Sequence, residues 1–519
     1  MDQKHKIAQL FSPAAFIHDT EENIQAMEAL VREQKIGGIT FFHSRHSAAA
    51  NFEKRQETLS YKNTLEKLQT LITRYQKAAE IPLLISIDAE FGLAMRVEKT
   101  PQYPYAISLG AMPIESDDLV EEVGYRIGKD LRQCGIHVNF APVADINTNP
   151  KNPVIGYRSF GTDREKVSRF ALAYYRGLRK AGIEGSFKHF PGHGDTDVDS
   201  HLGMPVIQKS REQLMQEEIF PFLQGIKAGV GMVMVGHLAA PALTQGKNIP
   251  ASISREIITD FLKTELGFNG IVVSDALNMR AISNLFPRPG ELEWKAFEAG
   301  NDLLCFSENV REGIDWIAQH AHPAEIEASF EKIMTLKKKL GLFDEKPITS
   351  IDFEWEDYRA FLERLAPQFL SVVVDKGLPL SGKMAKLSIQ EPEQNLFFNT
   401  IDAHSPCPTF ILDDSEMDIS EELDNYDWVL VSLFVPSAKP VNNFGLDLHL
   451  LERLSTIALK KPCVLYLFGN PLSLPKIPNH SDFHKIVCAF QQFPACQNAA
   501  AQHFLGQIQA QGSWKQKKD

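Results

Sequence analysis

The chain has few cysteines, no long apolar run and a deficit of positive charge. Its six cysteines among 519 residues show no CxxC spacing, which favours reduced structural thiols. No run approaches the roughly 20 apolar residues that a membrane-spanning helix needs. The formal net charge of -12 argues against a nucleic-acid partner, since such proteins usually present a basic face. We therefore expect a globular protein with no membrane span and no nucleic-acid partner.

A clear signal peptide is also lacking. Lys4 and Lys6 precede an apolar segment, but Gln9, Ser12 and Pro13 interrupt it and no small-residue cleavage site follows. We therefore expect a cytoplasmic protein, or a periplasmic or secreted one if a signal peptide was removed before this numbering began.

The first two-thirds of the chain alternates short β-prone runs with stretches of helical period. The eight runs are 7–12, 36–42, 82–88, 137–145, 185–189, 232–237, 270–276 and 302–306. Helical segments are predicted near 20–34, 61–79, 117–134, 163–181, 211–228, 254–266, 292–299 and 308–320. Because no Gly-rich dinucleotide fingerprint follows the first run, this α/β pattern favours a (β/α)8 TIM barrel over residues 1–346.

The remaining residues, 347–519, predict a smaller C-terminal α/β domain that is sandwich-like. A Lys-rich helix near 325–342 precedes Pro347, and the acidic, aromatic stretch after Pro347 is interpreted as a linker. Strands are expected at 369–375, 386–389, 427–434, 462–467 and 485–490, with helices near 446–459 and 495–510.

Polar residues gather where five of the eight runs end. They are Asp88, Asp145, the pair Lys188 and His189, His237 and Asp275. In a barrel the carboxyl ends of the strands face one mouth, so these residues are predicted to surround one pocket. A helix cap or a loop anchor would explain any one of them singly. For Asp275 a nucleophile and an N-cap are both open.

A polar loop follows the fifth run, from Lys188 to His201. Asp199 and His201 are two residues apart, so a carboxylate can orient an imidazole and raise its pKa, which makes a proton donor. His193, Asp195, Asp199 and His201 are also metal-ligand types, but their spacing matches no established metal signature. We expect neither a metal nor an organic cofactor.

Four blocks together resemble glycoside hydrolase family 3, in its bacterial β-N-acetylglucosaminidase branch. They are Asp88-Ala89-Glu90, the stretch from Ala141 to Gly161, the Lys188-to-His201 block that reads KHFPGHG and then DSH, and Ser274-Asp275. The resemblance covers about residues 1–345. The DSH sequence separates this branch from the β-glucosidases of the family.

The resemblance implies a retaining mechanism and assigns the residues. Asp275 would attack the anomeric carbon, and His201 supported by Asp199 would act as acid and then base. Sugar hydroxyls would be held by Asp88, Arg96, Arg158, Lys188, His189 and His237. One departure is Phe91, where many relatives have glycine, and this aromatic side chain could alter aglycone preference.

These assignments imply an exo-β-N-acetylglucosaminidase that releases terminal GlcNAc from peptidoglycan fragments or chito-oligosaccharides. Three alternatives stay open. A histidine acid/base does not repel phosphate, so a phosphorylase is chemically allowed. The other two are a β-glucosidase and a non-catalytic glycan-binding protein, because a fold never guarantees an activity.

Overall fold

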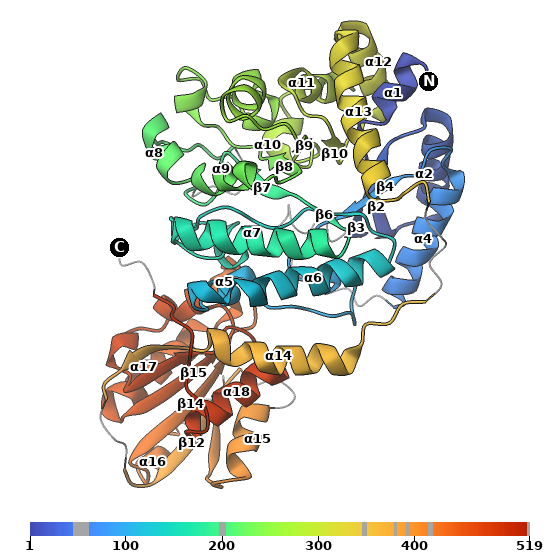
Figure 1. Cartoon of the computed structure of the whole chain (residues 1–519). Coiled ribbons are helices and arrows are strands. Elements are labelled where there is room, and N and C mark those ends of the chain that lie inside the picture. Colours follow the sequence, from blue (N-terminus) through green and yellow to red (C-terminus); the bar gives the residue numbers. More distant parts are fainter. Residues whose placement is uncertain are drawn as a thin grey trace. The chain divides into compact units, whose positions relative to one another are not determined.

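The computed structural model describes residues 1–44, 62–196, 204–344, 350–377, 381–390, 395–413 and 419–515. The chain divides into two compact units (Figure 1). The first comprises Met1–Tyr103, Asp117–Ile155 and Thr162–Phe353, and the second comprises Pro104–Ser116, Gly156–Gly161 and Glu354–Asp519. Two short segments from the first third of the chain thus belong to the second unit. The predicted boundary between residues 346 and 347 lies outside the described residues.

The first unit is built on parallel strands. They are β1 (Phe11–Ser12), β2 (Ala14–His18), β3 (Gly38–Ser44), β4 (Leu84–Ile87), β5 (Val138–Asn139), β6 (Glu184–Gly185), β7 (Phe187–Phe190), β8 (Met232–Val235), β9 (Ile271–Ser274) and β10 (Leu304–Cys305). Their order is β2-β3-β4-β5-β6 in one sheet and β7-β8-β9 in another, while β1 pairs with β10. Bridges from Val143 to Lys188 and from Val273 to Leu303 continue this sequence of neighbours.

The register of these strands brings their carboxyl ends level. Phe190 pairs with Val235, and Val235 pairs with Ser274. Residues that follow these strands, Asp275 among them, therefore lie at one edge. The predicted strand at 7–12 is correct only in its last two residues, because Asp2 caps a helix that includes Ile7.

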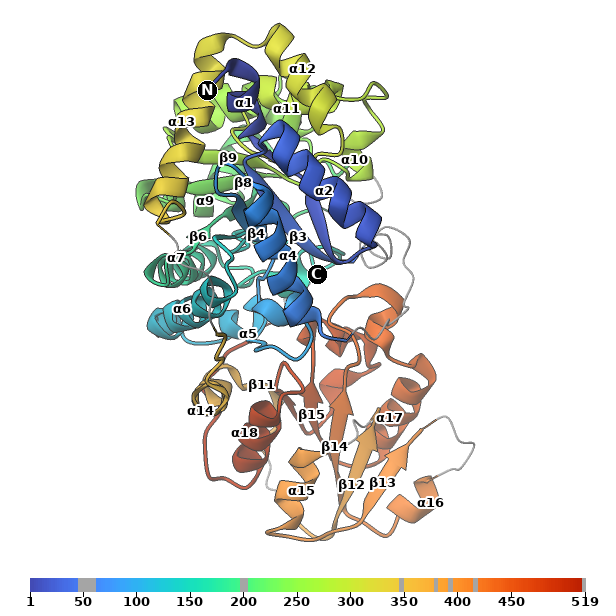
Figure 2. The ribbon, with the colours of Figure 1, turned by 90° about the vertical axis from the view of Figure 1, so that its right-hand side faces the viewer.

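Helices cover the outside of these strands (Figure 1, Figure 2). They are α1 (Gln3–Ala8), α2 (Glu21–Gln34), α4 (Thr64–Ala78), α6 (Asp117–Gln133), α7 (Arg164–Lys180), α8 (Arg211–Gln216), α9 (Phe220–Lys227), the π-helix η6 (Glu256–Glu265), α10 (Arg280–Ser283), α11 (Glu291–Ala299), α12 (Val310–His320) and α13 (Pro323–Lys339). The predicted helix at 211–228 is two helices, with Pro221 in the first turn of the second.

A side-chain cap begins α7, and two glycines set how closely α7 approaches α6. Asp163 begins α7 by accepting the amide of Lys166, as an N-cap aspartate does. A Cβ at Gly177 would lie 2.1 Å from the carbonyl oxygen of Glu121, and one at Gly124 would lie 2.2 Å from that of Tyr174. The two helices therefore approach each other as closely as glycine allows.

The second unit has a six-stranded sheet of order β11-β16-β15-β14-β12-β13. Its strands are β11 (Ser371–Asp375), β12 (Met384–Ile389), β13 (Thr409–Leu412), β14 (Trp428–Phe434), β15 (Cys463–Phe468) and β16 (Lys485–Cys488), and only the β11–β16 pairing is antiparallel. Its helices include α5 (Ala106–Gly110), α14 (Trp355–Phe369), α15 (Leu396–Asp402), α16 (Ser420–Leu423), α17 (Leu448–Lys460) and α18 (Pro494–Phe504).

Both faces of this sheet are covered. Leu465 and Leu467 of β15 pack in one apolar cluster with Leu454 of α17. The alternating residues Tyr466 and Phe468 contact the ring of Phe397 in α15. A strand buried on both faces reads as one continuous apolar run, which explains why β14 and β15 were predicted correctly.

Two predictions for this unit were wrong. The supposed linker after Pro347 contains α14, a helix of 15 residues, because its acidic first turn conceals the buried face formed by Phe361, Leu365 and Phe369. β13 was missed because it is an edge strand with exposed residues at Thr409 and Ile411.

Among the helices of the described ranges, none is long and apolar enough to cross a bilayer.

Candidate active site

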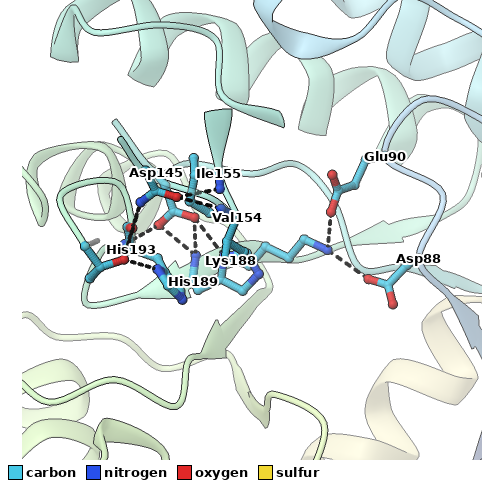
Figure 3. A network of polar contacts seen from close by, with 10 residues as sticks. Asp88, Glu90, Asp145, Val154, Ile155, Lys188, His189 and His193 are labelled. Carbon is cyan, nitrogen blue, oxygen red and sulfur yellow. Dashed lines mark hydrogen bonds and ion pairs between the residues drawn. The ribbon is translucent and has the colours of Figure 1, made fainter. Parts of the chain in front are cut away.

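Lys188 joins two carboxylates at the edge where the strands end (Figure 3). It lies in β7, and its side chain is only 2% exposed. Its Nζ is 2.8 Å from Oδ1 of Asp88, which follows β4, and 2.7 Å from Oε1 of Glu90. A buried ammonium needs such partners because desolvation of an isolated charge is costly. Lys188 and Asp88, predicted together from the strand ends, are thus in contact.

Arg96 adds a second cation beside Asp88. A guanidinium nitrogen of Arg96 lies 3.6 Å from Oδ2 of Asp88. The same guanidinium lies 4.0 Å from the ring centroid of Phe42, in a cation–π contact. Asp88 therefore has one cation near each carboxylate oxygen, and Arg96 is held on an aromatic surface.

His189 is fixed by the fully buried carboxylate of Asp145 (Figure 3). Its Nδ1 lies 2.7 Å from Oδ2 of Asp145, and its backbone amide donates to the same carboxylate at 3.1 Å. The amide of His193 donates to Oδ1 at 2.8 Å. Burial alone would raise the pKa of Asp145, but the nearby His189 and these hydrogen bonds outweigh burial and lower it. The contact at Nδ1 therefore fixes the orientation of the His189 ring.

The loop after β7 is tied down by short polar contacts. Nδ1 of His193 lies 2.7 Å from Oγ1 of Thr196, and Nδ2 of Asn152 donates to the carbonyl of His193 at 2.8 Å. Oδ1 of Asn152 in turn accepts the amides of Val154 and Ile155. Burial, with the charge of His189, lowers the pKa of His193 to about 4. His193 is therefore a neutral histidine built into the loop.

Asp275 follows β9 directly and is partly exposed. Its amide donates to the carbonyl of Val235 at 3.0 Å, and its Oδ1 accepts the amide of Ala276 at 2.8 Å. No other described residue donates a hydrogen bond to this carboxylate, so Oδ2 remains open. Burial raises the pKa of Asp275, but His237, His189, the Ala276 amide and Lys188 together lower it to about 2. The carboxylate is thus ionised at neutral pH.

His237 lies two residues beyond β8 and is fully buried. Its Nε2 lies 2.8 Å from the carbonyl oxygen of Ala276, and its Nδ1 lies 2.7 Å from Oγ of Ser252. Both ring nitrogens are therefore engaged by the protein. Of the charged groups that lower the pKa of Asp275, His237 has the largest effect.

The predicted residues separate into three groups. Contacts and electrostatic interactions bring together Asp88, Arg96, Lys188, His189, His237 and Asp275. Arg158 ends a short 3-10 helix, Gly156–Arg158, in a segment that belongs to the second unit. Asp199 and His201 lie outside the described residues. The assigned roles stay predictions.

Some contacts and supporting residues of the site were not predicted from the sequence. Asp145 is predicted at the pocket from its strand-end position, but its pairing with His189 is not. Glu90 lies in the same block as Asp88, so spacing could have found it. Nothing in the sequence indicates that Ser252 supports the site, because it lies 15 positions after His237 and no regular pattern connects the two residues.

One cluster of metal-ligand types lies at the ends of β2 and β3. Ligand atoms of His18, His43 and Glu98 lie within 4.8 Å of one another. Thr64 links His18 to Glu98, and Nζ of Lys67 lies 3.3 Å from Nδ1 of His18. A metal-bound histidine usually donates its other N–H to an acceptor, whereas here an ammonium occupies that position. The cluster therefore fits a hydrogen-bonded chain better than a metal centre.

Most of the chain matches a known protein family. Residues 3–336 match the family described as Glycosyl hydrolase family 3 N terminal domain. Beta-hexosaminidase A of Pseudoalteromonas piscicida is 35% identical over 341 residues, which cover 60% of this chain and 55% of that protein. The beta-N-acetylglucosaminidase/beta-glucosidase of Cellulomonas fimi is 29% identical over 355 residues, covering 66% and 58%. The chain thus spans little more than half the length of these two curated relatives.

A solved structure is similar over nearly the whole chain. It is a glycoside hydrolase family 3 beta-N-acetylglucosaminidase from Paenibacillus sp. str. FPU-7, with a TM-score of 0.79 and 27% identity. The similarity covers 99% of this chain and 98% of that one. Both units therefore have counterparts in that protein.

Proposed function

The chain belongs to glycosyl hydrolase family 3, and on this premise we propose that it is a retaining exo-β-N-acetylglucosaminidase. Its substrate would be a terminal β-linked GlcNAc on a peptidoglycan fragment or a chito-oligosaccharide. The observation that carries the proposal is the state of Asp275, an ionised strand-end carboxylate with one oxygen held and the other open. A nucleophile needs both properties. The relatives and the Paenibacillus structure support the choice of sugar.

Asp275 would attack the anomeric carbon through Oδ2. The bond from that carbon to the leaving oxygen breaks as the new ester bond forms, through an oxocarbenium-like transition state. Water then cleaves the glycosyl–Asp275 ester, and the configuration at the anomeric carbon is retained. A pKa of about 2 keeps Asp275 ionised across the whole range in which the protein could work.

The proton in each step would come from His201, oriented by Asp199. This assignment rests on the family resemblance, since both residues lie outside the described ranges. His201 would protonate the leaving oxygen and then remove a proton from the attacking water.

The sugar would be held by the polar groups around Asp275. Asp88 keeps acceptor capacity for hydroxyl donors, and Lys188 and Arg96 hold it in place. His189, whose ring is oriented by Asp145, is included among the sugar-binding residues on the resemblance. We include Arg158 among the sugar-binding residues on the resemblance alone.

We further infer that the first unit is a (β/α)8 barrel and the second a three-layered α/β sandwich. The barrel is supported by the pairing of β1 with β10 and by the succession of neighbours from β2 to β9. In such a barrel the residues after β4, β8 and β9 share one mouth, which matches the contacts around Asp275.

The first test is hydrolysis of an aryl β-N-acetylglucosaminide against an aryl β-glucoside, with and without phosphate. We expect release from the first substrate, and loss of roughly 10⁴-fold or more in kcat for Asp275→Ala. Asp118→Ala, an exposed carboxylate at the start of α6, is the matched control and should keep full activity.

Covalent chemistry can be tested separately. With an activated aryl substrate, His201→Ala should accumulate a glycosyl adduct visible in the intact mass, because departure of a good leaving group needs no acid while hydrolysis needs a base. The double variant with Asp275→Ala should show no adduct. A sugar 1-phosphate product would instead identify a phosphorylase, and preference for the glucoside a β-glucosidase. No turnover by folded protein would contradict the proposal and favour glycan binding.

A further inference from the structure

His237 has no ring nitrogen available for a ligand. The imidazole is fully buried and has a protein partner at each ring nitrogen. The partner at Nδ1, Ser252, is itself buried, and its carbonyl accepts Nδ2 of Asn301 at 2.8 Å. His237 is therefore the middle of a buried chain of hydrogen bonds from Asn301 to Ala276.

The direction of these bonds follows from their chemistry. A carbonyl oxygen only accepts, so Nε2 of His237 must carry a proton and donate a hydrogen bond to the carbonyl oxygen of Ala276. This holds for both the neutral and the cationic ring, because Nδ1 can either accept from or donate to the Ser252 hydroxyl. The bond to Ala276 is thus independent of the charge on His237.

That bond acts on the residue next to the nucleophile. The peptide unit that joins Asp275 to Ala276 supplies the amide that holds Oδ1 of Asp275 at 2.8 Å. On the other side, the amide of Asp275 is fixed to Val235, at the end of β8. Two contacts from β8 and its extension, one backbone and one through His237, therefore clamp the segment that carries the nucleophile.

We propose that His237 is a positioning residue for Asp275, and not a sugar contact. It would orient the Asp275–Ala276 segment so that Oδ1 stays on the Ala276 amide and Oδ2 points at the anomeric carbon. The inference rests on the proposed function, since it presupposes that Asp275 is the nucleophile. It replaces the sugar-binding role predicted for His237, for which neither ring nitrogen is available.

The test compares three variants with the wild type. His237→Leu removes both hydrogen bonds while keeping an apolar side chain of similar length, and His237→Gln keeps an amide nitrogen near the position of Nε2. Ser252→Ala removes only the partner at Nδ1. His137→Leu is the control, because His137 is an equally buried histidine that receives the Ile85 amide on Nδ1 and lies just before β5, at the amino end of that strand.

The measurements are kcat and KM on the aryl β-N-acetylglucosaminide with a good leaving group, the inhibition constant of free GlcNAc and the acid limb of kcat/KM. For His237→Leu we expect kcat to fall roughly 10- to 100-fold, as for supporting residues that orient a reacting group. The GlcNAc inhibition constant should stay within about threefold, since such a residue leaves the bound ground state untouched. The acid limb should move to higher pH because Asp275 loses the electrostatic effect of His237, which lowers the pKa of this carboxylate.

His237→Gln should recover most of kcat, and Ser252→Ala should lose less than His237→Leu. His137→Leu should lower the melting temperature without changing kcat. A rise of roughly tenfold in the GlcNAc inhibition constant with kcat unchanged would mean a sugar contact and would overturn the inference. Unchanged kinetics would overturn it as well. If His237→Leu fails to fold, the test uses kcat and the GlcNAc inhibition constant of His237→Gln and Ser252→Ala. A fall in kcat at an unchanged inhibition constant supports a positioning role, and the reverse contradicts it. An inactive wild type would instead contradict the proposed function.

Discussion

Asp302 and Asp275 lie at opposite ends of strands in the first unit, and their surroundings differ. Asp302 precedes β10, and each of its carboxylate oxygens has close partners. Asp302 accepts from Lys263 and Ser329 on Oδ1 and from Lys332 and the Val272 amide on Oδ2, at 2.9 to 3.2 Å. At the carboxyl ends, Asp275 has one amide on Oδ1 and only more distant charges otherwise.

Because of this difference, Asp302 is suited to stabilising the fold and Asp275 to a chemical role. A carboxylate with four donors has no capacity left for a ligand, so Asp302 can only hold the fold together. Glu184 is similar, because Tyr175 donates to one of its oxygens and Arg179 pairs with the other. Asp275 keeps an open oxygen and stays ionised through nearby positive charge, which is the arrangement that a nucleophile requires.

The largest effect on stability is expected for Asp302 and the residues that donate to it. Asp302→Asn leaves Lys263 and Lys332 without their anion, and breaking a buried ion pair on one side typically costs about 3–5 kcal/mol. Denaturant unfolding should report this loss, while kcat per folded molecule stays at the wild-type value. Asp118→Ala should change neither. A large loss of kcat in folded Asp302→Asn would show that the two ends are not separate.

The second prediction is that the unfolding free energy depends on pH through His193, which lies at the carboxyl ends of the strands. The pKa of His193 is about 4 in the folded protein, against an ordinary value of 6.5. The unfolded chain therefore binds the proton more tightly, so the stabilisation is complete above pH 6.5 and is lost as the pH falls toward 4. The shift corresponds to about 3 kcal/mol. His193→Gln should flatten the fall in unfolding free energy between these pH values, and an unchanged slope would contradict a buried neutral His193.

The smallest effect is expected at Glu90, which shares Lys188 with Asp88. Glu90→Gln keeps the shape and an acceptor but removes one charge, so we expect a loss of about 1 kcal/mol in unfolding free energy. kcat/KM should fall less than tenfold, in keeping with about that energy. The control is Glu121→Gln, which removes a surface pair with Arg176 and should cost less than about 0.5 kcal/mol. Equal losses in the two variants would mean that burial adds nothing to the Lys188 pair.

Hydrophobic periodicity and the positions of polar residues at strand ends were enough to predict many of the strands and several site residues. The apolar runs placed β3, β4, β8 and β9 within a few residues, because strands buried on both faces are marked by continuous apolar sequence. The contact of Lys188 with Asp88 agrees with the prediction that both lie at strand ends around one pocket, although their strands, β7 and β4, are not adjacent in the strand order. The resemblance implies the same sugar-binding role for His189 and His237, and strand-end position does not reveal that the protein engages both ring nitrogens of His237.

Other features depend on long-range packing that no local pattern carries. Ser252 meets His237 only because η5 (Ala251–Ile253) folds back beside β8, through the bond from the Ala251 amide to the Leu238 carbonyl. α14 was mistaken for a linker because charge outweighed its apolar period. Residues 104–116 gave no sign that they belong with the C-terminal part of the chain.

That last feature has a consequence for synthesis on the ribosome. The amide of Tyr105 is bound by the side chain of Gln491, 386 residues later, and the carbonyl of Ala111 accepts the amide of Ser513. At roughly 5–20 residues per second, Tyr105 emerges on the order of 20–80 s before its partner. The second unit therefore cannot finish folding until residue 513 has been translated, and its segment at residues 104–116 must wait, exposed or bound by a chaperone, until then.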